Sequence, residues 1–208
     1  MKLTKFPHAC LRIEQDGGVL VVDPGVFSEP GDALRGADAV LITHEHADHV
    51  DVDALKAAAR RELAVYAHAD VAAQLTEVDA AVTAVAPGDS FTAAGMEVRV
   101  FGDRHAHIHE DVPDIPNNAY LIGGRVYYAG DAFSLPGVEV ETLFVPIGAP
   151  WMKLAEAIDY VRAVAPQRAH PTHDAVLSTA GQSISDNWLT QRGGTSYSRL
   201  TPGTPTEL

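Results

Sequence analysis

The segment THEHADH, residues 43–49, places three histidines and one aspartate directly after an apolar run. Neutral imidazole and carboxylate are good ligands for Zn²⁺ and other first-row divalent ions, and a catalytic site combines about three protein ligands with an open position. His44 and His46 are two residues apart, so an extended chain points both rings the same way. Asp48 and His49 are adjacent and face a second position once the chain turns toward a helix. The spacing therefore predicts a loop that serves two metal ions.

Further carboxylates and imidazoles occur near the ends of other expected strands. They are Asp23 in VVDPG, the histidines of FGDRHAHIHED, Asp131 in YYAGD and His173 in HPTHD. The second of these segments contains His105, His107 and His109, and all three share a face if the loop is extended. In a helical turn only His105 and His109 do, and the pattern leaves both arrangements open.

The composition excludes several classes of function. The formal net charge is −13, from 15 basic and 28 acidic residues, which argues against broad electrostatic binding to nucleic acid or an anionic membrane. A single cysteine, Cys10, excludes an intramolecular disulfide framework and a thiolate-rich metal site. No apolar run of signal-peptide length follows the first lysines, and no stretch reaches the ~18 apolar residues of a membrane span. We therefore expect a cytoplasmic protein.

The first half of the chain predicts strands that alternate with short helices. Residues 9–24 indicate a hairpin that turns at residues 16–18, where Asp-Gly-Gly is a typical turn sequence. Residues 39–42 are all apolar, as in a strand covered on both faces. Asp51 can cap a helix whose apolar positions, such as Leu55, have helical spacing. A strand in LAVYAH and a short helix in DVAAQL follow.

The second half repeats the order of strands before helices. Strands are expected at residues 91–93, 96–101, 119–122 and 126–128 and in TLFVPIG, followed by an amphipathic helix in KLAEAIDYVRAVA. Residues 191–208 are rich in Gly, Thr and Pro and are expected to form a loose C-terminal tail. The remaining residues, 1–190, are expected to form one domain.

The order of these motifs resembles that of the metallo-β-lactamase superfamily. H-x-H-x-D-H after a buried strand, VVDPG, the histidine-bearing loop at residues 102–109, YYAGD and HPTHD follow the superfamily's order between about residues 6 and 178. The resemblance implies an α+β fold, a four-layer αββα sandwich, with the site at one open edge between the two sheets. Residues 1–190 would then be a hydrolase domain of this fold.

Two details are similar to the branch typified by ascorbate-6-phosphate lactonase. One is PHAC, which contains His8, and the other is DHVDVDAL after the metal motif, where glyoxalase II-like members usually carry glycines. Oxygen-reducing di-iron members of the superfamily typically have glutamate at the position of His46. The histidine in this chain therefore favours a hydrolytic site.

The resemblance also implies a role for each motif residue. Seven residues would bind metal: His44, His46 and His105 the first ion, Asp48, His49 and His173 the second, and Asp131 both. His109 is the alternative to His105, which follows the strand more closely. Asp23 would orient ligands, and contacts with ligands or substrate are expected of His8, His109 and His170. The implied cofactor is a pair of divalent ions, with Zn²⁺ preferred and Mn²⁺, Fe²⁺ or Ni²⁺ as alternatives.

The implied function is hydrolysis of a small molecule by a hydroxide shared between the two ions. Asp48 would orient the hydroxide and pass its proton to the leaving group. The expected substrate is a small, anionic ester, lactone or phosphoester, with Trp151 and Lys153 near the rim of the site. Two alternatives are a phosphodiesterase or nuclease of the ribonuclease Z type, which the absence of a basic arm disfavours, and a metal-holding module without catalysis. A homo-oligomer stays open, and neither a membrane nor a nucleic-acid partner is expected.

Overall fold

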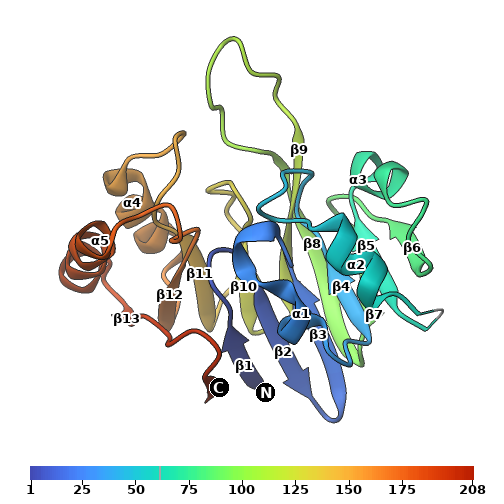
Figure 1. The fold of residues 1–208 in the computed structure, drawn as a ribbon. Helices are drawn as coiled ribbons and strands as arrows, with labels where there is room; N and C mark the ends of the chain where they lie inside the picture. The colour runs from blue at the N-terminus through green and yellow to red at the C-terminus, as the bar shows by residue number, and fades with distance from the viewer. Residues whose placement is uncertain (61) are drawn as a thin grey trace.

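Two seven-stranded sheets face each other in the computed structural model, which describes residues 1–60 and 62–208 (Figure 1). The strand order of the first sheet is β14-β1-β2-β3-β4-β5-β6, and that of the second is β13-β12-β11-β10-β9-β8-β7. Both ends of the chain therefore contribute to the same sheet, and each half of the sequence builds most of one sheet.

The strands of the first sheet are β1 (Lys2–Lys5), β2 (Leu11–Gln15), β3 (Gly18–Val22), β4 (Ala39–Leu41), β5 (Ala64–Ala67), β6 (Ala81–Ala84) and β14 (Pro205–Glu207). Those of the second are β7 (Ser90–Ala93), β8 (Met96–Arg104), β9 (Pro116–Ile122), β10 (Val126–Tyr128), β11 (Thr142–Pro146), β12 (Arg168–Thr172) and β13 (Ser196–Tyr197). The described helices are η1 (Val26–Ser28), α1 (Pro30–Leu34), α2 (Val52–Ala58), α3 (Ala69–Gln74), α4 (Leu154–Val164) and α5 (Thr179–Arg192). None of these helices is long and apolar enough to cross a membrane.

Alternating side chains of the first sheet face two different cores. Leu20, Val22 and Leu41 point between the sheets, where Tyr120 of the second sheet meets them. Val40 points to the other side, into a core shared with helices α1, α2 and α3. Because side chains alternate along a strand, one apolar strand can serve both cores, as predicted for residues 39–42.

The second sheet is covered in the same way on its outer face. Leu143 and Val145 of β11 belong to a third core with Ala157 and Val161 of α4 and Leu189 of α5. Helices thus lie outside each sheet, and an apolar core separates the two sheets (Figure 1). This arrangement confirms the predicted α+β, four-layer αββα sandwich.

The parallel strands of both sheets end at one edge of the sandwich. β3, β4 and β5 are parallel neighbours in the first sheet, as are β10, β11 and β12 in the second. Asp23 follows β3, the THEHADH motif follows β4, Asp131 follows β10 and His173 follows β12. The fold therefore brings residues from four distant segments to one place.

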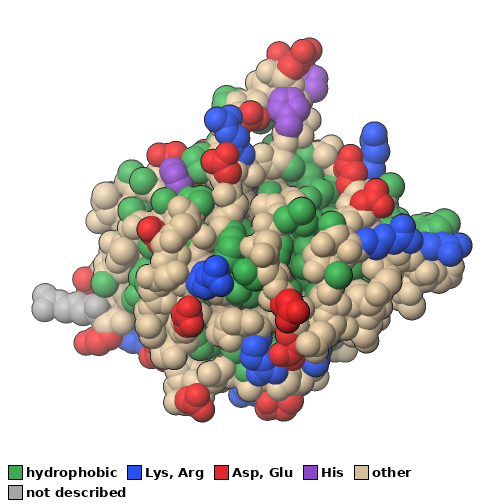
Figure 2. Space-filling view, turned by 180° about the vertical axis from the view of Figure 1, so that it is seen from behind, with side chains coloured by type: hydrophobic (Ala, Val, Ile, Leu, Met, Phe, Trp, Pro, Cys, Tyr) green, Lys and Arg blue, Asp and Glu red, His purple; other side chains and the backbone are tan. Residues whose placement is uncertain are grey.

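Residues 105–115, which we call the arm, connect β8 and β9 and project beyond this edge (Figure 1). Histidine and acidic side chains gather on this projection (Figure 2). His105 lies at the base of the arm, because β8 continues to Arg104 and pairs with β9 as far as Pro116. The strand is longer than the predicted range of 96–101.

The end of the chain differs from expectation. The loose tail expected at residues 191–208 contains β13 and β14, and β14 pairs antiparallel with β1. This correction has a physical cause, since the strand partner comes from the opposite end of the sequence and leaves no local signal. α5 was also not predicted, and it extends past the expected domain boundary at residue 190.

Candidate metal centre

Histidine and aspartate side chains converge where the parallel strands end. In three groups, the ligand atoms lie within 4.8 Å of one another. The groups are His44, His46 and His105; His8, Asp48, His49 and His173; and His44, His49 and Asp131. Shared members join the groups into one cluster. All seven residues predicted to bind metal lie in it.

The loop of the THEHADH motif turns immediately after β4. His49 N donates to His46 O (2.9 Å), and Asp51 then caps α2 as predicted. The backbone of Gly25 lies directly against this turn, and there is no room for a side chain, because a Cβ at that position would lie 1.9 Å from Asp48 O. The turn gives the two halves of the motif different directions, as their spacing predicted.

Asp131 lies between the groups. Its Oδ1 is 3.1 Å from His49 Nε2. Its Oδ2 is 3.0 Å from His173 Nε2 and 3.5 Å from His105 Nε2. Gly130 permits this approach, because its φ is +62° and a Cβ there would lie 2.4 Å from a neighbouring side-chain oxygen. Both carboxylate oxygens of Asp131 therefore face imidazole nitrogens.

Four imidazole rings of the cluster are oriented through Nδ1. The ring nitrogens donate as follows: His44 to Thr43 Oγ1 (3.0 Å), His49 to Asp23 Oδ2 (2.6 Å), His105 to Ala106 O (2.6 Å) and His173 to Gly148 O (2.5 Å). Metal-binding histidines typically make such an outer hydrogen bond, which fixes the ring and frees the other nitrogen. In these four rings the nitrogen that faces the rest of the cluster is Nε2.

Three buried atoms at the centre make no well-directed hydrogen bond among the described residues: His49 Nε2, His105 Nε2 and Asp131 Oδ1, although the first and last of these lie 3.1 Å apart. Leaving a buried polar group unpaired costs about 1–3 kcal/mol, so native structures rarely do so without a reason. Imidazole nitrogen and carboxylate oxygen together suit first-row divalent ions. The cluster therefore fits bound cations.

Charges within the cluster shift the pKa values of its members. Burial lowers the pKa of His44 well below its ordinary value, which keeps this ring neutral. Burial alone would also lower the pKa of His49, but Asp131 and Asp23 raise it well above its ordinary value. Burial lowers the pKa of His173, but its contacts with Asp131 and Asp48 have the larger effect and raise this pKa to about 9. As metal ligands, His49 and His173 would first have to lose a proton.

His8 and Asp23 both contact the predicted ligands. Ala175 N donates to His8 Nδ1 (3.4 Å), so His8 Nε2 carries the proton and donates to Asp48 Oδ2 (2.9 Å). Asp23 accepts from His49, as described above. Their orienting roles stay predictions, but each side chain lies where that role requires it.

Three residues at the centre have left-handed backbone: φ is +62° at His8, +47° at Asp23 and +56° at His173. Such values are uncommon outside glycine and cost free energy. His173 N donates to His8 O (3.1 Å), so two of these residues hold each other in place. The fold therefore maintains strained backbone at this edge.

Other candidate histidines lie outside the cluster. The His109 side chain is 60% exposed in the arm, against 3% for His105. His107 Nδ1 lies 3.1 Å from an aspartate of the arm. His170 donates from Nδ1 to Ser198 O (2.8 Å) and belongs to none of the three groups found among residues 1–60 and 62–208. The structure thus brings His105, and not His109, to His44.

The sequence did not predict the residues that hydrogen-bond to Asp23 and Asp131. Thr43 N and Oγ1 donate to Asp23 Oδ1 (2.8 Å) and Oδ2 (2.7 Å). Asn117 Oδ1 accepts from Asp131 N (3.1 Å). Thr43 directly precedes the motif, so its position was a usable signal. Asn117 has none, because it reaches Asp131 across neighbouring strands.

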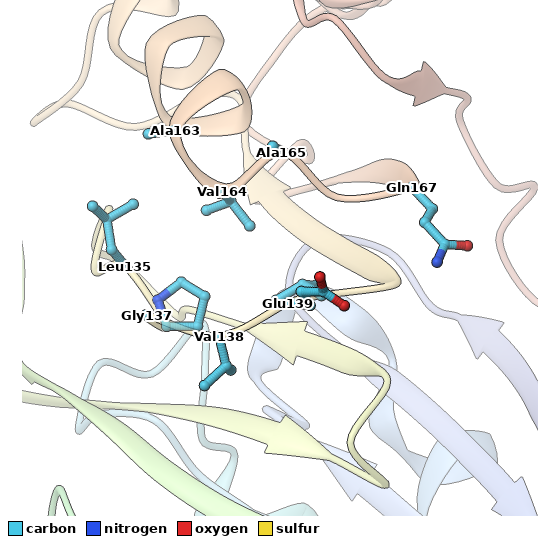
Figure 3. Close-up of a pocket in the computed structure, with 10 residues that line it drawn as sticks. Leu135, Gly137, Val138, Glu139, Ala163, Val164, Ala165 and Gln167 are labelled. Carbon is cyan, nitrogen blue, oxygen red and sulfur yellow. The ribbon is translucent and has the colours of Figure 1, made fainter.

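A surface groove of about 740 Å³ lies away from the cluster. Leu135, Val138 and Glu139 line one side of it, and Val164 and Gln167 the other (Figure 3). No member of the cluster lines this groove. The cluster, and not this groove, is therefore the candidate functional site.

The comparison with known families agrees with this geometry. The family model described as the Beta-lactamase superfamily domain matches residues 2–173. The chain belongs to this superfamily. The matched range includes every residue of the cluster.

Relatives and solved structures support the same assignment. Protein Rv0786c of Mycobacterium tuberculosis is 41% identical over 207 residues, which cover 96% of each chain. The UPF0173 metal-dependent hydrolase MK1542 of Methanopyrus kandleri is 28% identical, over 83% of this chain and 84% of the relative. The metallo-beta-lactamase fold protein YhfI of Bacillus subtilis has the same fold, with a TM-score of 0.78, 18% identity and coverage of 99% of this chain and 98% of that chain.

His105→Ala should release metal, whereas His109→Ala should not. His105 is buried against His44 and His46, with ring centroids 4.9 and 4.8 Å away, so its loss removes a predicted ligand atom. We expect zinc affinity to fall at least about tenfold for His105→Ala only, as measured by competition with a chromophoric chelator. A larger loss for His109→Ala would show that the third ligand comes from the exposed part of the arm.

Proposed function

We propose that this metal-dependent hydrolase of the metallo-β-lactamase fold holds two divalent ions and cuts an ester, lactone or phosphoester bond in a small, anionic molecule. The observation that carries the proposal is the position of Asp131. Its two oxygens face different imidazoles of the cluster, and buried atoms around it lack hydrogen-bond partners among the described residues. A carboxylate so placed supports a pair of ions rather than one.

Two sets of side chains would hold the ions: His44, His46 and His105 on one side, Asp48, His49 and His173 on the other, with Asp131 shared. Zn²⁺ suits this donor set, and Mn²⁺, Fe²⁺ or Ni²⁺ are the alternatives. When bound, the ions would lower the pKa of a water molecule and polarise the bond to be cut. Their charge exceeds that of the two carboxylates, which favours an anionic substrate.

Asp48 is the member of the cluster best placed to move a proton. Its side chain is 22% exposed, whereas that of Asp131 is buried. Burial would raise the pKa of Asp48, but His173 and His8 lower it and keep the group ionised. An ionised carboxylate at the opening can accept a proton from the attacking water and return it to the leaving group.

The proposal includes the lactonase-like branch and a cytoplasmic location. The contact between His8 and Asp48 supports the branch, because His8 lies in one of the two segments on which that resemblance rests. The net charge of −13 supports a small-molecule substrate rather than a nucleic acid.

Metal removal is the direct test. We expect the purified protein to contain about two divalent ions per chain and to hydrolyse at least one member of an ester, lactone and phosphodiester panel. Dialysis against a chelator should abolish that activity, and added Zn²⁺ or Mn²⁺ should restore it. Hydrolysis that persists after elemental analysis shows the ions gone would contradict the proposal.

A further inference from the structure

Trp151 contacts the carboxylate at the heart of the cluster. It lies in the connection between β11 and α4, and its indole Nε1 donates to Asp131 Oδ2 (3.1 Å). The edge of the indole also meets the ring of His105, with centroids 6.0 Å apart and planes at 75°. One side chain thus touches two of the predicted metal ligands.

Aromatic packing holds the indole in this position. Its ring meets Phe133 edge to face, with centroids 5.3 Å apart, and Phe133 in turn packs on Tyr160 of α4 at 5.0 Å. The Tyr160 hydroxyl donates to Ser134 O (2.9 Å), which fixes the segment that carries Phe133. Trp151 is therefore supported from the helical layer outside the second sheet.

The indole donor suits a carboxylate that must serve two cations. Its hydrogen bond to Oδ2 favours one rotation of the carboxylate, in which Oδ1 lies 3.1 Å from His49 Nε2 and Oδ2 lies 3.0 Å from His173 Nε2. Indole N–H is a neutral donor, so it brings no positive charge that would repel a cation nearby, as lysine or arginine would. The indole can therefore orient the carboxylate without repelling a cation bound beside it.

We propose that Trp151 is a positioning residue of the metal centre: its indole N–H holds the Asp131 carboxylate so that both oxygens are presented to the ions. The inference rests on the proposed two-ion function but concerns a residue outside the predicted ligand set. It implies that loading with metal changes the surroundings of the indole, and that loss of the N–H weakens binding.

The two tryptophans of the chain provide a matched pair for the test. Trp188 lies on α5 and is 46% exposed, away from the cluster. We expect Trp151→Phe to weaken zinc binding about tenfold or more in a chelator competition with metal-stripped protein, and Trp188→Phe to leave it unchanged. With excitation selective for tryptophan, the emission of the Trp188→Phe protein comes from Trp151 and should change on zinc addition, and that of Trp151→Phe should not.

The outcomes separate the two proposals. Wild-type protein that binds none of Zn²⁺, Mn²⁺, Fe²⁺ and Ni²⁺ overturns the proposed function and this inference with it. Two ions bound with wild-type affinity by Trp151→Phe overturn this inference alone. If Trp151→Phe does not fold, the Trp188→Phe protein decides, since emission that does not respond to zinc loading contradicts contact between the indole and the metal centre.

Discussion

Asp131→Asn is expected to reduce bound metal from about two ions per chain to one or fewer and to lower hydrolysis by at least ~100-fold. The amide keeps the shape of the side chain, but it removes the negative charge that two closely spaced cations need between them. The amide nitrogen would also present hydrogens to His49 or His173, whose Nε2 atoms lie 3.1 and 3.0 Å from Asp131 Oδ1 and Oδ2. The fold should survive, because the hydrogen bond from Asp131 N to Asn117 Oδ1 does not involve the substituted group.

Metal content by mass spectrometry and turnover on the substrate found in the panel would measure this effect. Asp38→Asn is a control with the same substitution, since the Asp38 carboxylate also accepts a hydrogen bond, from Val19 N (2.9 Å), but lies outside the cluster. Full metal content together with undiminished turnover in Asp131→Asn would show that the two-ion mechanism is wrong.

Asp23→Asn is expected to damage both metal binding and stability. Asp23 is fully buried, with 0% exposure, and accepts from Thr43 N, Thr43 Oγ1 and His49 Nδ1 at 2.8, 2.7 and 2.6 Å. An amide can accept at only one of its two terminal atoms, so at least one donor is left unpaired. We expect zinc affinity to fall about 10–100-fold and the metal-free protein to lose about 1–3 kcal/mol of unfolding free energy.

Substitution by asparagine tests the hydrogen bonds of Asp23 without changing its backbone conformation. The φ of Asp23 is +47°, which asparagine tolerates as well as aspartate does. Denaturant unfolding of metal-free protein and a zinc titration would give the two quantities. Unchanged zinc affinity would mean that the orientation of His49 does not depend on Asp23.

The convergence of the candidate metal ligands was largely predictable because its signals are local. His44, His46, Asp48 and His49 lie within one turn after an apolar strand, and their types name the chemistry. The choice between His105 and His109 was harder, because it depends on where β8 ends. β8 continues three residues beyond Phe101, and this extension places His105 at the base of the arm.

Other features could not be predicted, since they depend on contacts between distant segments. α5 exposes Ile184 and Trp188 and buries few apolar side chains, so its sequence lacks a clear apolar stripe. β14 is a strand only because β1 offers it an edge. The hydrogen bond from Trp151 to Asp131 joins the loop after β11 to the loop after β10, and no spacing in the sequence predicts it.

The left-handed backbone at His8, Asp23 and His173 lowers the stability of the fold at the candidate metal centre. Each such residue costs about 1–3 kcal/mol, whereas glycine adopts the same conformation freely. At Asp23, glycine would also leave the buried donors of Thr43 and His49 unpaired, which offsets the relief of strain. Laboratory evolution for heat resistance alone should therefore replace His8 or His173 before Asp23. A selection that also demands turnover should retain all three side chains, so these positions would report whether a selection acted on catalysis or only on stability.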